Sequence, residues 1–237
     1  MLLLAIDTST TAITVGLHDG TSVVAEATTL DARAHAEHLA PGIGRALAEV
    51  GAAPGDVTDV VVGIGPGPFT GLRVGIVTAR TFAFATGVPV RGLTSLDAIA
   101  HEAWLAGQRG DLLVATDARR KEVYAAAYVL GDERAQRASD PVVSRAAELP
   151  EELRALPTAG RGPALYADAL PHALPPLDVS GGALADLAVR RLGERPCAGD
   201  GELQHVDPGH GFDGLEPLYL RRPDVSPAPT SAKSTLG

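Results

Sequence analysis

The chain has 237 residues, 45% hydrophobic content, a formal net charge of -9 and a single cysteine. This content can fill a real core, and the negative charge disfavours nucleic-acid binding by the chain as a whole. One cysteine excludes an intrachain disulfide and a thiolate zinc cluster. The apolar run at the start ends at Asp7 with no basic segment before it, and no later run has the length of a membrane span. We therefore expect a cytoplasmic protein.

Alternating and β-branched residues predict three strands at the start of the chain. They occupy residues 2–9, 11–20 and 21–29, and the Asp19-Gly20 pair is typical of a tight hairpin turn. These strands are expected to form an antiparallel meander.

A helix is predicted over residues 35–51. Leu39, Ile43 and Leu47 fall at helical spacing, and Gly51 is placed to end the helix in a left-handed conformation. Pro41 suits only the first turn of a helix, so we expect the regular helix to begin close to it.

A strand, a second helix and another strand follow. Residues 56–65 form an apolar run without alternation, which indicates a strand covered on both faces. Residues 69–87 predict a helix closed by Gly87, and residues 88–95 a further strand. Together with the meander, these elements predict one mixed-sheet α/β lobe.

The second half of the chain begins with the pattern of the first. Aligning LAIDTSTTAITVGL with LVATDARRKEVYAAAY places Asp7 opposite Asp117, each between a strand and a polar turn. This predicts a tandem duplication of one α/β unit with a joint near residues 107–110. The expected lobes are residues 1–106 and 107–222, with helices at 144–156 and 181–194, a late strand at 217–222 and a disordered tail at 223–237.

The glycine-rich stretch GIGPGPFTG, residues 63–71, joins a predicted strand to a predicted helix, which is the placement of an anion-binding turn. Its details disagree with nucleotide motifs. Leu72 and Arg73 stand where a phosphate loop needs Lys and then Ser or Thr, and Pro68 stands where a dinucleotide loop needs its third glycine. Pro66 and Pro68 also lack an N–H donor. We favour a tightly packed strand-to-helix turn, with an anion site as the alternative.

Small residues form a row along the second predicted helix, at Gly71, Gly75, Ala79 and Ala83. Such a row lets two helix backbones approach closely. Packing inside the lobe and contact with another subunit both agree with this spacing.

Five motifs in order resemble the TsaB family of bacterial tRNA threonylcarbamoyladenosine biosynthesis proteins: LAIDTST, GPGPFTGLRVG, GLTSLDA, TDARRKEVYAAAY and PLYLRR. The resemblance extends from Leu3 to about Asp224. It implies an actin-like, ribonuclease-H-like α/β fold with two duplicated lobes of mixed sheet and helices. It also implies a heterodimer with the catalytic paralogue TsaD, which transfers the threonylcarbamoyl group to an adenosine of tRNA. The pathway ATPase TsaE and tRNA are then expected to be reached only through that complex, and a homodimer is an alternative assembly.

The departures from this kinship concern metal and phosphate binding. By the resemblance, the catalytic paralogue holds a metal with two histidines one helical turn apart, where this chain has Ser95 and Ile99. Neither residue replaces an imidazole ligand. Actin-like ATPases carry glycine in both phosphate loops, and here Ser9 and Ala118-Arg119 stand there. We expect no metal and no cofactor; the remnants of a degraded phosphate site are Asp7, Ser9, Asp117, Gly65 and Gly67.

Two further clusters hold metal-ligand residue types. His35, Glu37 and His38 do not match HExxH and indicate no third ligand, so a polar helix start or an interface is favoured. For the glycine-rich loop at residues 205–214, a surface turn is favoured over a metal site. The residues of this loop whose side chains commonly bind metals are His205, Asp207, His210 and Asp213.

Three other features have a simple structural explanation. The hydroxyls of Thr8, Ser9 and Thr10 are expected to cap their own backbone. The Arg119-Arg120-Lys121 cluster is a candidate contact for RNA or an acidic partner, or a solvated hairpin end. Trp104 is expected to anchor the core or the boundary between the lobes.

The sequence thus predicts a non-catalytic partner subunit in tRNA threonylcarbamoyladenosine synthesis. The alternatives are an actin-like ATP-dependent phosphotransferase or ATPase using Asp7 and the 63–71 loop, and a metalloprotease. By the resemblance, the first two helices pair with the equivalent helices of TsaD. The residues expected at this interface are Leu39, Ile43, Leu47, Phe69, Leu72, Arg73, Gly75, Ile76, Ala79 and Arg80.

Overall fold

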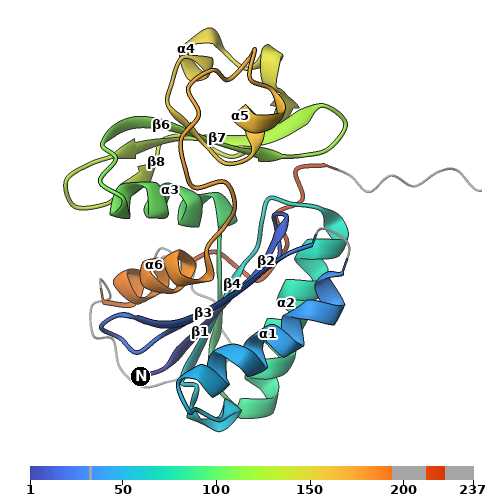
Figure 1. Cartoon of the computed structure of the whole chain (residues 1–237), viewed down its shortest axis with the longest axis vertical. Helices are drawn as coiled ribbons and strands as arrows, with labels where there is room; N and C mark the ends of the chain where they lie inside the picture. Colours follow the sequence, from blue (N-terminus) through green and yellow to red (C-terminus); the bar gives the residue numbers. More distant parts are fainter. Residues whose placement is uncertain (32–33, 194–211, 222–237) are drawn as a thin grey trace, which may run out of the picture.

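The computed structural model describes residues 1–31, 34–193 and 212–221. Two mixed sheets lie one above the other, with two helices between them and further helices on the outer faces (Figure 1). Within the described ranges, no helix combines the length and the apolar character that crossing a membrane requires.

The first sheet contains five strands in the order β3-β2-β1-β4-β5. β1 (Leu3–Asp7), β2 (Ala12–His18) and β3 (Val23–Leu30) form the antiparallel meander predicted from alternation. β4 (Asp59–Gly63) pairs in parallel with β1, and β5 (Val90–Leu93) pairs in parallel with β4. Parallel neighbours need a crossover connection, and helices provide both crossovers here.

One face of the first sheet is covered by α1 (His35–Glu49) and α2 (Phe69–Thr86) (Figure 1). As predicted, Gly87 closes α2 with a φ of 73° and Gly51 follows α1 with a φ of 67°. The expected start of α1 near Pro41 is wrong, because the helix begins at His35 and contains Pro41. This proline removes only one N–H from the helix and lies on the exposed side, while buried Leu39 holds the same turns against the sheet.

The second sheet has the order β10-β6-β7-β8, with β9 pairing beside them on β7. Its centre is the long hairpin of β6 (Gly110–Asp117) and β7 (Glu122–Leu130). The short strands are β8 (Ala135–Arg137), β9 (Val142–Arg145) and β10 (Thr158–Ala159). Asp117 ends β6 as Asp7 ends β1, so the predicted repeat of the hairpin is present.

Two predicted elements of the second half are wrong. Residues 144–156 form the end of β9, a 3-10 turn (Ala146–Glu148) and a one-turn helix α4 (Glu151–Arg154), because Pro150 has no N–H to continue a helix. Residues 217–221 form no strand. Instead, the Leu218 N–H donates to the carbonyl oxygen of Ile64, the residue after β4, at 2.8 Å. The tail predicted at 223–237 lies outside the described residues.

Two helices fill the space between the sheets. α3 (Ser95–Leu105) packs against β6, β7 and β8, whereas α6 (Gly181–Gly193) packs against β1, β2 and β3, and the two helices contact each other. Each helix therefore covers the sheet formed by the other half of the chain. The ribbon in Figure 1 shows this exchange.

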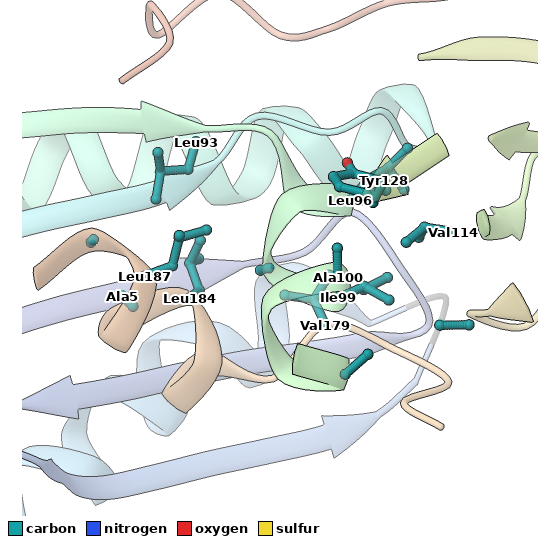
Figure 2. Close-up of a cluster of buried hydrophobic side chains, with 14 of the residues drawn as sticks. Ala5, Leu93, Leu96, Ile99, Ala100, Val114, Tyr128, Val179, Leu184 and Leu187 are labelled. Carbon is teal, nitrogen blue, oxygen red and sulfur yellow. The ribbon is translucent and has the colours of Figure 1, made fainter. Parts of the chain in front are cut away.

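The layer between the sheets is one apolar cluster. Figure 2 shows Leu93, Ile99, Val114 and Leu184 converging from β5, α3, β6 and α6. Each of these side chains is at most 1% exposed. Burial of one such side chain contributes about 1.5–3 kcal/mol, so this layer joins the two sheets into one unit.

Polar contacts align the two central helices. Asp97 of α3 accepts a hydrogen bond from Arg191 of α6 at 2.8 Å, and His101 of α3 lies 2.7 Å from Asp186 of α6. Trp104 donates to the carbonyl of Gly131 at 2.8 Å, which agrees with its predicted place at the boundary. Because burying these groups without partners would be costly, they favour one relative placement of α3 and α6.

The start of α6 approaches β2 without an intervening side chain. A Cβ on Gly16 would collide with the backbone carbonyl of Gly181, and the Gly181 N–H donates to the Thr14 hydroxyl at 2.9 Å. Glycine at both positions therefore permits the contact between this helix and the first sheet.

The segment at residues 212–221 joins both halves of the fold. The Asp213 carboxylate accepts from the N–H and the hydroxyl of Thr94 at 2.7 and 2.9 Å. Tyr219 stacks on Phe69 at the start of α2, with ring centroids 4.9 Å apart. Arg221 pairs with Glu122 at the end of the β6–β7 hairpin. This segment thus fixes the start of α2 relative to the second sheet.

We predict that Glu102→Gln stabilises the protein at alkaline pH. Among the described residues, the buried Oε2 of Glu102 has no hydrogen-bond partner. Burial raises the pKa of Glu102 to about 7, and the Glu26 carboxylate adds to this rise. The folded state therefore holds a proton that the unfolded state releases, and the free energy of unfolding falls as pH rises from the ordinary glutamate range to about 7.

The free energy of unfolding of Glu102→Gln, measured by urea denaturation, should exceed that of the parent by about 1–2 kcal/mol at pH 8 and by less at pH 5. The exposed Glu133→Gln serves as the control and should change neither value. Equal gains for Glu102→Gln at both pH values would contradict the assignment.

Candidate functional site

A cleft lies where the turns of the two equivalent hairpins face each other. The β1–β2 turn contributes Ser9, Thr10 and Thr11, and the β6–β7 turn contributes Asp117 and Arg119. The cleft is shallow and is also bordered by His35, Pro68, Arg161 and Asp178. The duplicated units thus meet at equivalent points of their sheets.

Asp7 is close to the cleft but is sealed from it. Its side chain is fully buried, and one carboxylate oxygen accepts from the N–H and the hydroxyl of Ser9, both at 2.7 Å. The other oxygen accepts from the Ser95 hydroxyl at 2.6 Å. Burial raises the pKa of Asp7, and the hydrogen bonds from Ser95 and Ser9 oppose this rise. Both oxygens of the carboxylate are therefore bound within the protein.

Ser95 and Ile99 occupy the positions where the resemblance places imidazole ligands in the catalytic paralogue. The Ser95 hydroxyl bridges the Asp7 carboxylate and the N–H of Gly65, which donates to it at 3.0 Å. Ile99 is fully buried in the apolar layer. A metal centre built on these two positions does not fit, because one is a hydrogen-bond bridge and the other is a core side chain.

The glycine loop is packed against the first hairpin. A Cβ on Gly67 would lie 2.5 Å from the carbonyl oxygen of Ser9, and Tyr124 places its hydroxyl 3.4 Å from the Gly67 carbonyl. The Gly65 N–H is already used by Ser95, and the two prolines of the loop supply no N–H donor. A triphosphate therefore does not fit this loop, which agrees with the tightly packed turn that we favoured from the sequence.

The second hairpin keeps the turn but changes its side chains. Asp117 accepts from the N–H of Arg119 at 2.8 Å, as Asp7 accepts from the N–H of Ser9. Asp117 also pairs with the Arg119 guanidinium at 3.2 Å. Across the cleft, Arg161 forms a bidentate pair with Asp178, whose shortest distance is 2.6 Å. The charged residues of the cleft are thus compensated by each other.

His35 is the first residue of α1 and lines the cleft. Its side chain is buried, and among the described residues its Nε2 has no hydrogen-bond partner. His38 points elsewhere and lies 3.8 Å from Asp31. Across the described ranges, no group of three or more His, Cys, Asp or Glu side chains is arranged to hold a metal ion. His205, Asp207 and His210 lie outside the described residues, and Asp213 binds Thr94.

Most of the residues expected at the partner interface lie in the core of their own lobe. Those buried beneath α1 and α2 are Leu39, Ile43, Leu47, Leu72, Gly75, Ile76 and Ala79. They face the first sheet, so their assignment to an outer surface is corrected. The row of small residues explains this orientation, because a Cβ on Gly71 would lie 2.5 Å from the carbonyl of Thr8. At Gly71 and Gly75 the close approach is between α2 and Thr8, the residue that follows β1.

The outer face of these helices carries a different pattern. Arg73, Val77, Arg80 and Phe84 are exposed at the spacing of one helical stripe, which we call the α2 stripe. Val77 is 60% exposed and Phe84 90% exposed. Arg73 and Arg80 were expected at this surface from the sequence, whereas Val77 and Phe84 were missed. Their spacing of seven residues was the available signal.

α1 presents a smooth row beside the α2 stripe. Ala40, Gly44 and Ala48 recur every fourth residue and are all exposed. No atom lies within 4 Å of a Cβ built on Gly44. The exposed Val77 and Phe84 of the α2 stripe, beside a row of small residues, suit close packing by another helix pair.

Residues 23–178 match the family described as TsaD: tRNA N6-adenosine threonylcarbamoyltransferase. An uncharacterized protein of Mycobacterium tuberculosis is 41% identical over 94% of this chain and 93% of its own length. The tRNA threonylcarbamoyladenosine biosynthesis protein TsaB of Bacillus subtilis is 34% identical over 54% of this chain and 55% of its own length.

Solved structures agree with the sequence matches. A Pseudomonas aeruginosa protein described as similar to the peptidase YeaZ gives a TM-score of 0.75 at 27% identity, covering 93% of this chain and 99% of its own. YeaZ from Pseudomonas aeruginosa gives a TM-score of 0.71 at 30% identity, covering 81% and 92%. The expected actin-like fold with two mixed α/β lobes is confirmed. By the family match and the near full-length relatives, the chain belongs to the TsaD/YeaZ family.

Proposed function

We propose that this chain is the TsaB-type, non-catalytic partner subunit of a tRNA threonylcarbamoyltransferase. It binds and activates the catalytic paralogue TsaD, and through that complex it meets tRNA and the pathway ATPase TsaE. The observation that carries the proposal is the state of the cleft, where Asp7 and the glycine loop are bound by Ser9 and Ser95.

Partial matches support the assignment to the TsaB branch. Besides the Bacillus subtilis protein, TsaB of Escherichia coli is 38% identical over 54% of this chain. Fold kinship alone does not imply an activity, so the argument rests on the residues of the cleft. Their hydrogen-bond donors and acceptors bind other groups of the same chain, which favours a scaffold or activator role over phosphoryl transfer.

The docking surface that we propose is the outer face of α1 and α2. It comprises the α2 stripe and the row of Ala40, Gly44 and Ala48. An almost fully exposed Phe84 is costly to leave in water, and exposed apolar groups of this kind mark interaction surfaces. The equivalent helices of TsaD are the proposed occupant. A two-fold homodimer through the same face is the alternative assembly, since a two-fold contact needs only one self-complementary patch.

We predict that Val77→Glu weakens association with TsaD at least about tenfold, because a carboxylate would lose its hydration at the centre of the contact. Arg73 and Arg80, one turn away on the same stripe, offset only part of this cost. The measurement is the dissociation constant of the mixed proteins, with light scattering to report the mass of the product. Thermal unfolding of the isolated variant should stay close to that of the parent, since Val77 is exposed.

Two controls separate this surface from general damage. Val142→Glu introduces the same charge at another exposed valine, on β9, and should leave association unchanged. Ile76→Ala, one residue from Val77 but buried at 4% exposure, should lower the free energy of unfolding by about 2–4 kcal/mol. If Val77→Glu associates like the parent, the proposed face is wrong.

The main rival is an ATP-dependent phosphotransferase or ATPase acting at the cleft. We predict that titration of the isolated chain with ATP and magnesium shows no saturable heat, and that the chain releases no phosphate above the buffer rate. The physical reason is that Gly65, Ser9 and Ser95 direct their donors inward. Brisk turnover by the isolated chain would overturn the partner-subunit proposal. A stoichiometric metal in elemental analysis would favour the metalloprotease alternative.

A further inference from the structure

We propose that the turn between β6 and β7 contacts the phosphate backbone of tRNA bound to the complex. The basic tip is defined here as Arg119, Arg120 and Lys121. The inference rests on the proposed function and extends it, because it gives this subunit a direct contact with the nucleic acid. All three side chains of the basic tip are exposed.

The backbone of the basic tip is unusual. Arg119, Arg120 and Lys121 have φ values of 63°, 52° and 64°, so three successive residues with side chains adopt the left-handed conformation. Each such residue costs roughly 1–2 kcal/mol relative to the ordinary helical region. The turn persists because Asp117 accepts from the Arg119 N–H at 2.8 Å and the Glu122 N–H donates to the Arg119 carbonyl at 2.9 Å. Strain of this kind concentrates at functional sites.

Two carboxylates lie beside the basic tip, and each pairs with an arginine. Asp117 pairs with Arg119, and Glu122 pairs with Arg221 from the C-terminal segment. Arg145 lies opposite Glu122 in the register of β9 against β7 and pairs with Glu148 at 3.3 Å, so this pair leaves the formal charge of this end unchanged. By formal charge this end is basic, since the basic tip and Arg221 carry four positive charges beside the two carboxylates, in a chain whose formal net charge is -9.

The chemistry of the basic tip fits phosphate better than a protein surface. Protein interfaces are centred on buried apolar or aromatic side chains, and the three residues of the tip provide none. The guanidinium groups of arginine and the ammonium group of lysine donate charge-assisted hydrogen bonds to phosphate oxygens. Because the rest of the chain is acidic, a polyanion would approach it favourably at this end and be repelled elsewhere. Such a contact fixes position without reading base sequence.

The test measures binding of a tRNA transcript to the complex with TsaD by fluorescence anisotropy over a range of salt concentrations. The variant is Arg120→Asn combined with Lys121→Asn, since asparagine tolerates the left-handed conformation and the turn should remain folded. At about 0.1 M salt we expect the dissociation constant to rise about tenfold. The slope of log affinity against log salt should become shallower by about 1.5–2.

The matched control removes two cations from the other end of the same hairpin. Arg109 precedes Gly110, which pairs with Leu130, and Arg134 lies beyond Leu130. Arg109→Gln combined with Arg134→Gln changes the net charge equally and should leave the salt slope unchanged. Arg120→Lys keeps the charge and should retain most of the affinity.

The outcomes separate this inference from the proposed function. If the unmodified chain forms no complex with TsaD, the proposed function fails and this inference falls with it. If the complex forms and the asparagine variant binds tRNA with an unchanged salt slope, only the inference is overturned. It is also overturned if the control variant loses as much affinity. Weaker association with TsaD by the asparagine variant would assign the basic tip to an acidic protein surface.

Discussion

The apolar layer between the two sheets is the constraint on which the rest of the structure depends. α3 and α6 each cover the sheet formed by the other half of the chain, so neither lobe buries its inner face without the other. Because this core is shared, the two hairpins are held at fixed positions on either side of the cleft. The Asp97–Arg191 and His101–Asp186 contacts favour a single alignment of the two helices.

That layer also limits the chemistry at the cleft. α3 begins at Ser95 and enters the core at once, so its first turn supplies a hydroxyl bridge and its second supplies the buried Ile99. The Asp7 carboxylate then has donors from Ser9 and Ser95 and is isolated from solvent. Hydrogen bonds to a buried carboxylate contribute about 1.5–3 kcal/mol each, which gives this arrangement a structural role. The backbone preserves the duplicated hairpin, while the side chains of Asp7, Ser9 and Ser95 stabilise the fold through their mutual hydrogen bonds.

The sequence by itself determined the order of the elements in the first sheet and the repeat of the hairpin, whereas α3 (Ser95–Leu105) was not predicted. Alternation located β1 to β3, unbroken apolar runs located β4, and Gly51 and Gly87 marked the ends of α1 and α2. Aligning Asp7 with Asp117 was enough to identify the repeat. These features depend on neighbours within a few residues, which is why local patterns reveal them. The exclusion of nucleotide motifs from the 63–71 loop had the same local basis.

Only the tertiary structure decided which face of each helix is free. Both faces of α2 carry a regular pattern: Gly71, Gly75 and Ala79 on one side, and the α2 stripe on the other. Close helix packing and close packing against a strand require the same small residues, so spacing cannot separate them. The contact of Gly71 with Thr8 settles the question, as does the exposure of Phe84. The exchange of α3 and α6 was likewise invisible in the sequence, because it depends on contacts between residues far apart in the chain.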